Sequence, residues 1–201
     1  MTSTSISETK AAPRRRRRKL LLRTVVCCSA TVLLWVTAGL FLFVAPTMDA
    51  PKHADVLLVL APAGDRMRHA ERLMDHGYAG TLAISVPLGY AGNPDSALCN
   101  EKRTYRIVCF SPDPVTTQGE ARALQRLSRE YGWQTANVLT MQSHVARARV
   151  ILERCYKGDL SMVGYWQDLP LLSLKNPRRS WAYRYAYETA AFVKVALNTG
   201  C

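Results

Sequence analysis

The sequence predicts an α/β domain, a Rossmann-like parallel sheet with helices on both faces, preceded by a single transmembrane helix. Three observations lead to this prediction. The segment 24–45 is uncharged over 22 residues, apolar strand-length segments alternate with amphipathic ones after residue 54, and four cysteines lie in that later part. Strands that alternate with helices pair in parallel, and right-handed crossovers place the helices on both faces of the sheet.

The uncharged segment Thr24–Ala45 is long enough, as a helix, to cross a hydrocarbon core of about 30 Å. The basic run Arg14–Lys19 precedes it, and basic residues beside a membrane helix favour the cytoplasmic side. We therefore expect a single-pass plasma-membrane protein with a cytoplasmic N-terminus and an extracytoplasmic C-terminal domain. The expected divisions are a basic cytoplasmic leader (1–19), the transmembrane helix (20–45), a short tether (46–53) and the folded domain (54–201).

The leader has two other possible interpretations. A cleaved signal peptide has an apolar stretch of only about 7–15 residues and a small-residue cleavage site. Here the stretch is longer, and Ala45 and Ala50 are each followed by proline. The segment Arg17–Leu21 faintly resembles a twin-arginine export signal, as would any arginine run before an apolar segment. An uncleaved anchor, with the arginines setting topology, is the interpretation we favour.

The net charge of +12 is unevenly distributed. Up to Ala45 there are eight basic residues and one acid, or +7, so the remaining 156 residues carry only +5. A globally basic fold that binds nucleic acid is therefore disfavoured. Ordinary glycine and proline contents, with 48% hydrophobic residues, exclude collagen-like and wholly disordered classes.

The first strand is predicted at Asp55–Ala61, whose sequence DVLLVLA is apolar enough for burial on both faces. A helix follows at Arg66–His76, where apolar residues recur at helical spacing, and Gly77 ends it. An irregular segment, 87–104, separates the next two strands. The remaining expected elements are strands at 81–86, 105–110, 136–140 and 160–165, and helices at 117–131, 143–156 and 181–198.

The four cysteines outside the membrane segment point to an oxidising compartment. They allow three pairings, of which we favour Cys99 with Cys109, closing the 87–109 insertion, and Cys155 with Cys201. The sequence has no CxxC motif and no His-rich spacing, so we expect no metal site. Because it also lacks a G-x-G-x-x-G motif, nicotinamide and S-adenosylmethionine chemistry are disfavoured and no cofactor is expected.

Open parallel sheets bind ligands beyond the carboxyl ends of their strands. One candidate group there is the segment Thr140–Arg147, which contains Gln142, Ser143 and His144 and runs from a strand end into a helix start. Backbone N–H groups, the helix dipole and Arg147 would face an anion together, and His144 would move a proton near neutral pH. The alternative is a Ser143 cap, a satisfied histidine and a surface arginine.

The segment Thr117–Glu120 poses the same choice. Thr-x-x-Glu before a helix is a capping box that needs no ligand, and this interpretation is favoured on the pattern alone. Asp65 and Arg66 either face a ligand or merely begin a helix, and Ser85 ends the second strand. His69 and His76 lack a third ligand and are interpreted as surface residues.

Several of these residues together resemble the SanA/YdcF/ElyC family of bacterial envelope proteins. The matching motifs are an R-x-x-x-A-x-x-L-x-x-x-G element (Arg66, Ala70, Leu73, Gly77), a strand-end Ser85, T-x-x-E-A (Thr117, Glu120, Ala121) and T-x-x-x-H-x-x-R-A (Thr140, His144, Arg147, Ala148). Glu188 resembles the glutamate of the family's final helix. The resemblance covers about 54–197, and the chain departs from it at Ala61–Gly64 and at Val86–Pro87, where the family has glycine-rich loops.

The resemblance implies a role in envelope integrity or in the metabolism of an anionic cell-wall precursor such as an isoprenoid phosphate. In a catalytic version His144 is the general acid/base, Glu120 the orienting carboxylate and Arg147 the anion clamp, with Thr117 and Ser143 as donors. Whether the protein is an enzyme is left open. The alternative is a non-enzymatic module that recruits or regulates cell-wall enzymes through the insertion and the aromatic C-terminal helix. Expected partners are the bilayer, an anionic small-molecule or lipid-phosphate ligand and cell-wall enzymes, and not nucleic acid.

Overall fold

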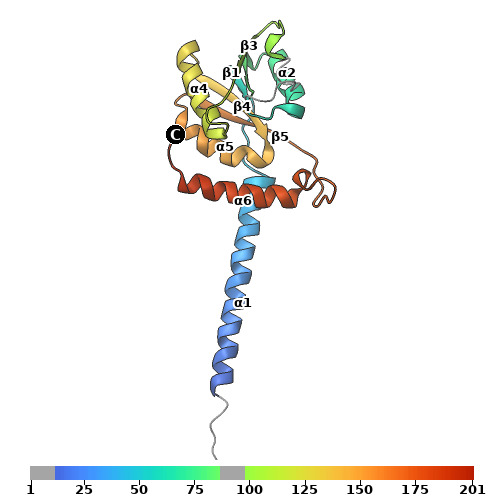
Figure 1. Cartoon of the computed structure of the whole chain (residues 1–201), viewed down its shortest axis with the longest axis vertical. Coiled ribbons are helices and arrows are strands. Elements are labelled where there is room, and N and C mark those ends of the chain that lie inside the picture. The colour runs from blue at the N-terminus through green and yellow to red at the C-terminus, as the bar shows by residue number, and fades with distance from the viewer. Residues whose placement is uncertain (1–11, 87–97) are drawn as a thin grey trace, which may run out of the picture. The chain divides into compact units, whose positions relative to one another are not determined.

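The computed structural model describes residues 12–86 and 98–201 and divides the chain into two compact units, Met1–Gly39 and Leu40–Cys201 (Figure 1). The described part of the first unit is helix α1, Ala12–Gly39. Within the described part of the chain, one helix is long and apolar enough to cross a membrane, and it runs from Arg15 to Val44. Its side chains are almost all exposed, unlike those of a core helix in a soluble protein. Residues 1–11 of the expected leader lie outside the described residues.

The second unit contains a five-stranded, wholly parallel sheet in the order β3-β2-β1-β4-β5. Its central strand pairs on both sides, with Val56 opposite Thr81 on one neighbour and Ala136 on the other. The predicted α/β, Rossmann-like fold class is confirmed. The strands are β1 (Ala54–Val59), β2 (Ala79–Ser85), β3 (Arg106–Phe110), β4 (Thr135–Met141) and β5 (Asp159–Tyr165).

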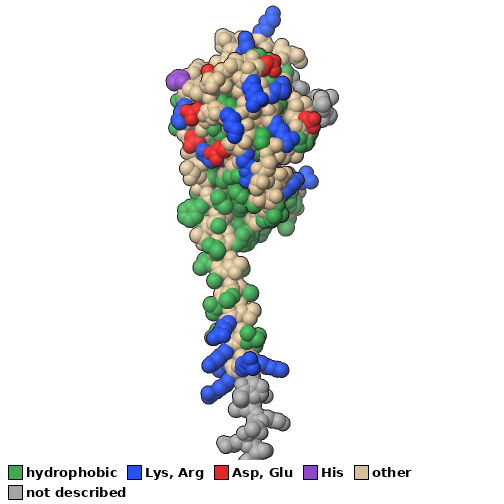
Figure 2. Space-filling model, turned by 90° about the vertical axis from the view of Figure 1, so that its left-hand side faces the viewer, with side chains coloured by type: hydrophobic (Ala, Val, Ile, Leu, Met, Phe, Trp, Pro, Cys, Tyr) green, Lys and Arg blue, Asp and Glu red, His purple; other side chains and the backbone are tan. Residues whose placement is uncertain are grey.

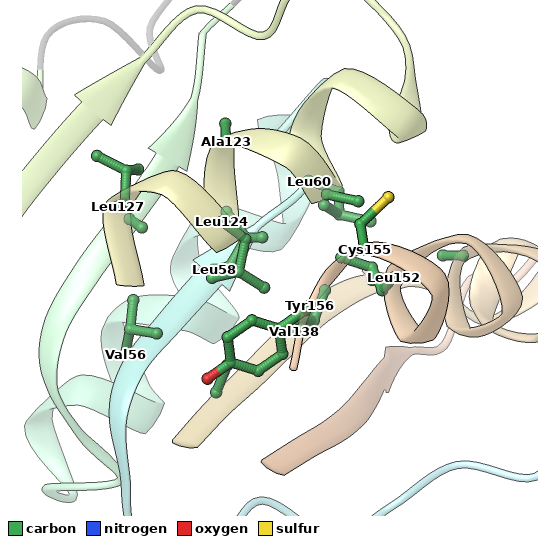
Figure 3. Close-up of a cluster of buried hydrophobic side chains, with 14 of the residues drawn as sticks. Val56, Leu58, Leu60, Ala123, Leu124, Leu127, Val138, Leu152, Cys155 and Tyr156 are labelled. Carbon is green, nitrogen blue, oxygen red and sulfur yellow. The ribbon is translucent and has the colours of Figure 1, made fainter. Parts of the chain in front are cut away.

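Alternate side chains of β1 enter two separate cores, because successive side chains of a strand point to opposite faces. Leu57 and Val59 pack in the core that includes α2 (Met67–Asp75). Val56 and Leu58 pack on the other face, in the core that includes α4 (Thr117–Tyr131) and α5 (Gln142–Cys155) (Figure 3). Burial on both faces explains why this strand has no polar alternation.

The remaining elements follow the predicted order. A 3-10 turn, Gly64–Arg66, precedes α2, and α6 spans Trp181–Leu197 after a second such turn at Pro177–Arg179. Residues 87–97, most of the expected irregular insertion, lie outside the described residues, and a short 3-10 turn follows at Leu98–Asn100.

Both favoured cysteine pairings are present. Cys99 and Cys109 join the turn after the insertion to β3, with their Cα atoms 5.8 Å apart. Cys155, the last residue of α5, is bonded to Cys201, with a Cα–Cα distance of 4.9 Å. The second disulfide therefore holds the segment beyond α6 against α5.

The segment 46–53, expected to be a tether, is bonded to the domain along its length. The backbone of Asp49 donates to the carbonyl of Met162, and its carboxylate accepts from the Met162 N–H at 2.8 Å and from Arg149 at 2.9 Å. Lys52 exchanges backbone hydrogen bonds with the amide of Asn137. The segment is thus part of the second unit, which already begins at Leu40.

Candidate functional site

A cleft of about 680 Å³ lies at the carboxyl edge of the sheet. The loop after β1, the first turns of α4 and α5, and one side of α6 form its walls. The helix N-termini bring unpaired backbone N–H groups and positive dipole ends to this place. Its polar lining consists of Thr116, Thr117, Gln118, Glu120, His144, Arg147, Arg154, Arg178, Tyr183, Arg184, Tyr187, Glu188, Lys194 and Asn198.

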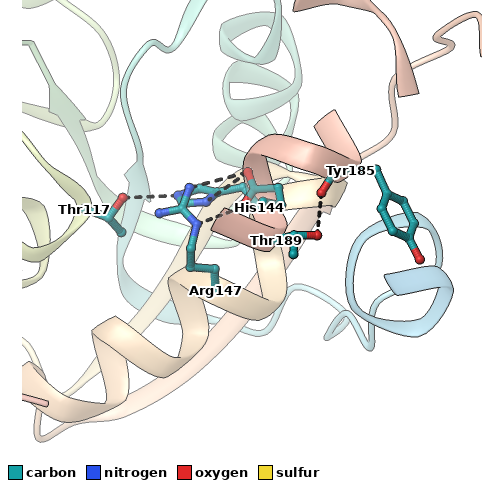
Figure 4. A network of polar contacts seen from close by, with 6 residues as sticks. Thr117, His144, Arg147, Tyr185 and Thr189 are labelled. Atoms are coloured by element: carbon teal, nitrogen blue, oxygen red, sulfur yellow. Dashed lines mark hydrogen bonds and ion pairs between the residues drawn. The ribbon is translucent and has the colours of Figure 1, made fainter. Parts of the chain in front are cut away.

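His144 lies in the first turn of α5 and is only 7% exposed. Its Nε2 is 3.3 Å from the hydroxyl oxygen of Thr117, the first residue of α4. Its Nδ1 is 4.0 Å from a carboxylate oxygen of Glu188 and has no hydrogen-bond partner among the described residues. A hydroxyl, an imidazole and a carboxylate thus lie in a row across the cleft (Figure 4).

Burial lowers the pKa of His144 well below its ordinary value of 6.5, and the cations of Arg147, Arg66 and Arg184 lower it further. The imidazole is therefore neutral near pH 7. With its proton on Nδ1, facing Glu188, Nε2 becomes an acceptor for the hydroxyl of Thr117. A neutral imidazole that presents Nε2 as an acceptor can take a proton from a bound hydroxyl group.

The half-buried Arg147 and the buried Glu188 form a two-point ion pair, with Nε–Oε2 and Nη2–Oε1 distances of 2.7 and 3.4 Å. The Glu188 side chain is 1% exposed, so α6 contributes a fully desolvated carboxylate to the cleft wall. The carboxylate beside His144 is Glu188 rather than the predicted Glu120. Arg147 also differs from the expectation of an open anion clamp, because Glu188 occupies two of its donors.

Glu120 is buried on the opposite wall and serves the loop after β1. Its Oε1 accepts a hydrogen bond from the backbone N–H of Ala61 at 2.7 Å. Burial raises its pKa, against the lowering effects of this N–H, the Ser85 hydroxyl and the charges of Arg66 and Arg147. The predicted capping box does not form: the hydroxyl of Thr116 accepts from the N–H of Gly119 at 3.2 Å and caps α4.

Arg66 and Asp65, for which the sequence allows either a ligand-facing position or a plain helix start, lie in different places. Arg66 is buried and donates to the carbonyl oxygens of Leu60, Pro62 and Ala63, which holds the β1–α2 loop in shape. Asp65 is exposed beside a separate hollow of about 570 Å³ over α2, away from the cleft. Arg66 therefore acts through the loop and through its charge near Glu120, and Asp65 lines no part of the cleft.

The predicted residues at the end of β4 are all buried. Gln142 donates to the carbonyl of Val44 at 2.9 Å and accepts from the N–H of Gln167 at 3.0 Å, which is a structural link. The hydroxyls of Thr140 and Ser143 have no hydrogen-bond partner among the described residues. Met141 is the N-cap of α5 and makes no side-chain cap, so Ser143 is not the cap that the alternative interpretation required.

Four further cations line the cleft that the motifs did not identify: Arg154, Arg178, Arg184 and Lys194. Arg154 donates to the carbonyl of Val195, in the last turn of α6, and to that of Asn198, the residue after the helix. In the sequence, Glu188 stands out only through the family resemblance. Glu188 is also the single acid in the largely apolar helix 181–197. Because a buried carboxylate requires a charged partner, this position could have identified it from the sequence.

Within residues 12–86 and 98–201 no group of three metal-ligating side chains is close enough to hold an ion. Comparison with known proteins adds no assignment: no family model, curated protein or solved structure matches the chain.

Proposed function

We propose that the chain is a membrane-anchored envelope protein whose cleft binds an anionic, phosphate-bearing cell-wall precursor such as an isoprenoid phosphate. The observation that carries the proposal is the charge of the cleft. Besides Arg147, four cations line it (Arg154, Arg178, Arg184 and Lys194), whereas its two acids, Glu120 and Glu188, are buried and already bonded, Glu188 to Arg147 itself. Two helix N-termini at the same place supply backbone donors for phosphate oxygens.

The proposed topology has the N-terminus in the cytoplasm and the domain outside. The arginine run before the apolar helix supports this orientation through the excess of basic residues in cytoplasmic segments. The two disulfides support an oxidising compartment for the domain. A family relationship to SanA/YdcF/ElyC proteins would agree with both, and it rests on the motifs given above.

In the catalytic form of the proposal His144 is the base. Nε2 takes a proton from a hydroxyl group that attacks the phosphorus, the bond from phosphorus to the departing oxygen breaks, and His144 returns the proton to that oxygen. The attacking hydroxyl group would lie beside Nε2, on the side where the Thr117 hydroxyl is 3.3 Å away. Glu188 would stabilise the transient imidazolium and is itself held by Arg147.

Ligand titration of the full chain in detergent tests binding. Farnesyl phosphate is the probe, with farnesol as its uncharged counterpart and inorganic phosphate as the lipid-free one. Arg184→Gln should weaken farnesyl phosphate binding about tenfold or more, because a hydrogen bond to a charged group contributes about 1.5–3 kcal/mol. Arg126→Gln is the matched control, since Arg126 pairs with Glu130 on the exposed face of α4. Equal affinity for farnesol and farnesyl phosphate would contradict the proposal.

Turnover is tested separately. His144→Gln should abolish phosphate release from the same probe while the affinity changes little, and it should fail to restore envelope integrity in a deletion strain. His76→Gln, an exposed histidine outside the cleft, is the control. Full complementation by His144→Gln would leave a binding protein and exclude the catalytic form.

The alternative, a module that recruits cell-wall enzymes, predicts no affinity for the phosphorylated probe and protein crosslinks in cells. Exposed aromatic side chains at Trp166, Tyr183 and Tyr187 favour it as the second candidate. Crosslinking from these positions, together with a flat titration, would support it.

A further inference from the structure

The outward side of α6 is apolar, which is unusual for a helix that covers the surface of a domain. Of its nine exposed positions, Lys194 alone is charged; the others are Ala182, Tyr183, Ala186, Tyr187, Ala190, Val193, Ala196 and Leu197. They recur every three or four residues, so they form one broad stripe, here called the α6 stripe, whose edge at Tyr183, Tyr187 and Lys194 also borders the cleft. The inward side carries Glu188 and packs on α5.

The segment before α6 extends this apolar surface. Its side chains Trp166, Leu171, Leu172 and Leu174 are 60%, 74%, 70% and 99% exposed. Two backbone hydrogen bonds, from Trp181 to the carbonyl of Pro170 and from Ala182 to that of Leu171, hold the segment against the start of α6. We call residues 166–174 the leucine loop. Figure 2 shows another side of the folded unit, on which blue and red charged side chains are spread over much of the visible surface.

The end of the apolar helix packs against α6 within the same unit. Residues Leu40–Val44 are the last five of the segment long enough to cross a membrane, and they belong to the folded unit. Phe43 is 3% exposed, with its ring 5.3 Å from that of Tyr185 and 5.8 Å from that of Phe192. If the helix spans a bilayer, Val44 lies at the membrane surface, and α6 lies at the same depth because it contacts Phe43.

The charges beside the leucine loop suit a lipid surface. Lys175, Arg178 and Arg179 follow it and are exposed, and Arg178 also borders the cleft. The leucine loop itself contains one acid, Asp168, and the next acid along the chain is Glu188. Leucine, tryptophan and tyrosine beside lysine and arginine are typical of segments that lie in the interface of a membrane, with the apolar groups among the acyl chains and the cations at the phosphates.

We propose that the α6 stripe and the leucine loop lie in the interface of the bilayer that anchors the chain. The domain would then rest on the membrane at two places, the end of the spanning helix and the leucine loop. This proposal does not require that the cleft bind a phosphate or that His144 act as a base.

Spin labelling of the full chain in vesicles tests the contact. Cys27 and Cys28, the two unpaired cysteines of the described residues, lie in the apolar helix and are first replaced by alanine so that they take up no label. One new cysteine is then introduced, in place of Leu172 or Leu174. Glu130→Cys, on the exposed end of α4, is the control position. The measured quantity is the accessibility of each nitroxide to oxygen dissolved in the membrane and to a water-soluble nickel chelate. Labels at 172 and 174 should be more accessible to oxygen, and the label at 130 more accessible to the chelate.

Lipid charge provides the second arm. In phosphatidylcholine vesicles containing phosphatidylglycerol the labels should lie deeper than in phosphatidylcholine alone, and Lys175→Gln/Arg179→Gln should remove that difference. Equal access of the nickel chelate to positions 172, 174 and 130 would overturn the proposal. So would labels at 172 and 174 that are shielded from both reagents, because that result indicates a protein partner or a second copy of the chain over this surface.

Discussion

Two buried glutamates lie on opposite walls of the cleft, and their surroundings differ. Glu120 accepts from the backbone of Ala61 and lies by Ser85 and Arg66, in a network that holds the loop after β1. Glu188 pairs with Arg147 and faces an imidazole whose Nδ1 is unbonded among the described residues. On the first wall the polar groups bond one another and maintain the shape of the loop after β1. On the second wall the ion pair lies beside His144, a neutral base that lines the cleft.

The largest expected effect on stability comes from removing Glu188 from the second wall. Glu188→Ala leaves the guanidinium of Arg147, which is only 12% exposed, without its partner, and this should lower the free energy of unfolding by about 3 kcal/mol, the lower end of the range for buried pairs. The double variant Arg147→Met/Glu188→Leu removes both charges and should recover most of that loss. Urea unfolding of the full chain in mild detergent measures both. If the single and double variants were equally unstable, Glu188 would contribute through its packing rather than through the ion pair.

A smaller effect is expected on the first wall, where Gly119 brings α4 close to the preceding loop. A Cβ at this position would overlap the backbone carbonyl oxygen of Pro114. Gly119→Ala should therefore cost about 1–3 kcal/mol of unfolding free energy. Gly80→Ala is the matched control, because its Cβ would meet only Asp55 O at 3.8 Å. If Gly119→Ala left the free energy of unfolding unchanged, the first turn of α4 would be able to shift at little cost. The position of Thr117 relative to His144 would then be only weakly fixed.

The smallest effects concern pH, and the two walls should respond in opposite directions. The pKa of His144 is lowered by folding, so below pH 6.5 the unfolded chain binds a proton that the native state does not, and stability falls as pH falls. The pKa of Glu120 is raised, so its contribution falls as pH rises above 4.5. His144→Gln should remove the first dependence and Glu120→Gln the second. Melting temperatures measured between pH 4 and pH 8, a range set by these two ordinary pKa values, distinguish them.

The fold was predictable because its determinants are local. The apolar sequence of β1 requires cover on both faces, and the amphipathic spacing in α2 and α4 marks helices that supply it. The packing of 46–53 was not predictable, since Asp49 bonds Met162 across a separation of 113 residues and no pattern in either segment indicates the pairing.

The site was predictable in position but not in its pairings. Thr117 and His144 follow strand ends and therefore had to lie at one edge of the sheet. Two adjacent threonines, however, made the cap ambiguous by one residue, and Thr116 takes that role. The partner of Arg147 lies 41 residues away on α6, at a distance that no spacing rule covers.

The Cys155–Cys201 disulfide makes everything from the end of α5 to residue 201 a covalent ring, with a sequence separation of 46. The exposed Arg178 and Arg179 offer a protease a cutting site inside that ring. A single cut there opens the ring without releasing either piece, so α6 and its Glu188 stay joined to α5 until a reductant acts. The cleft wall formed by α6 would therefore stay attached after a single cleavage of the backbone, as long as the disulfide remains oxidised.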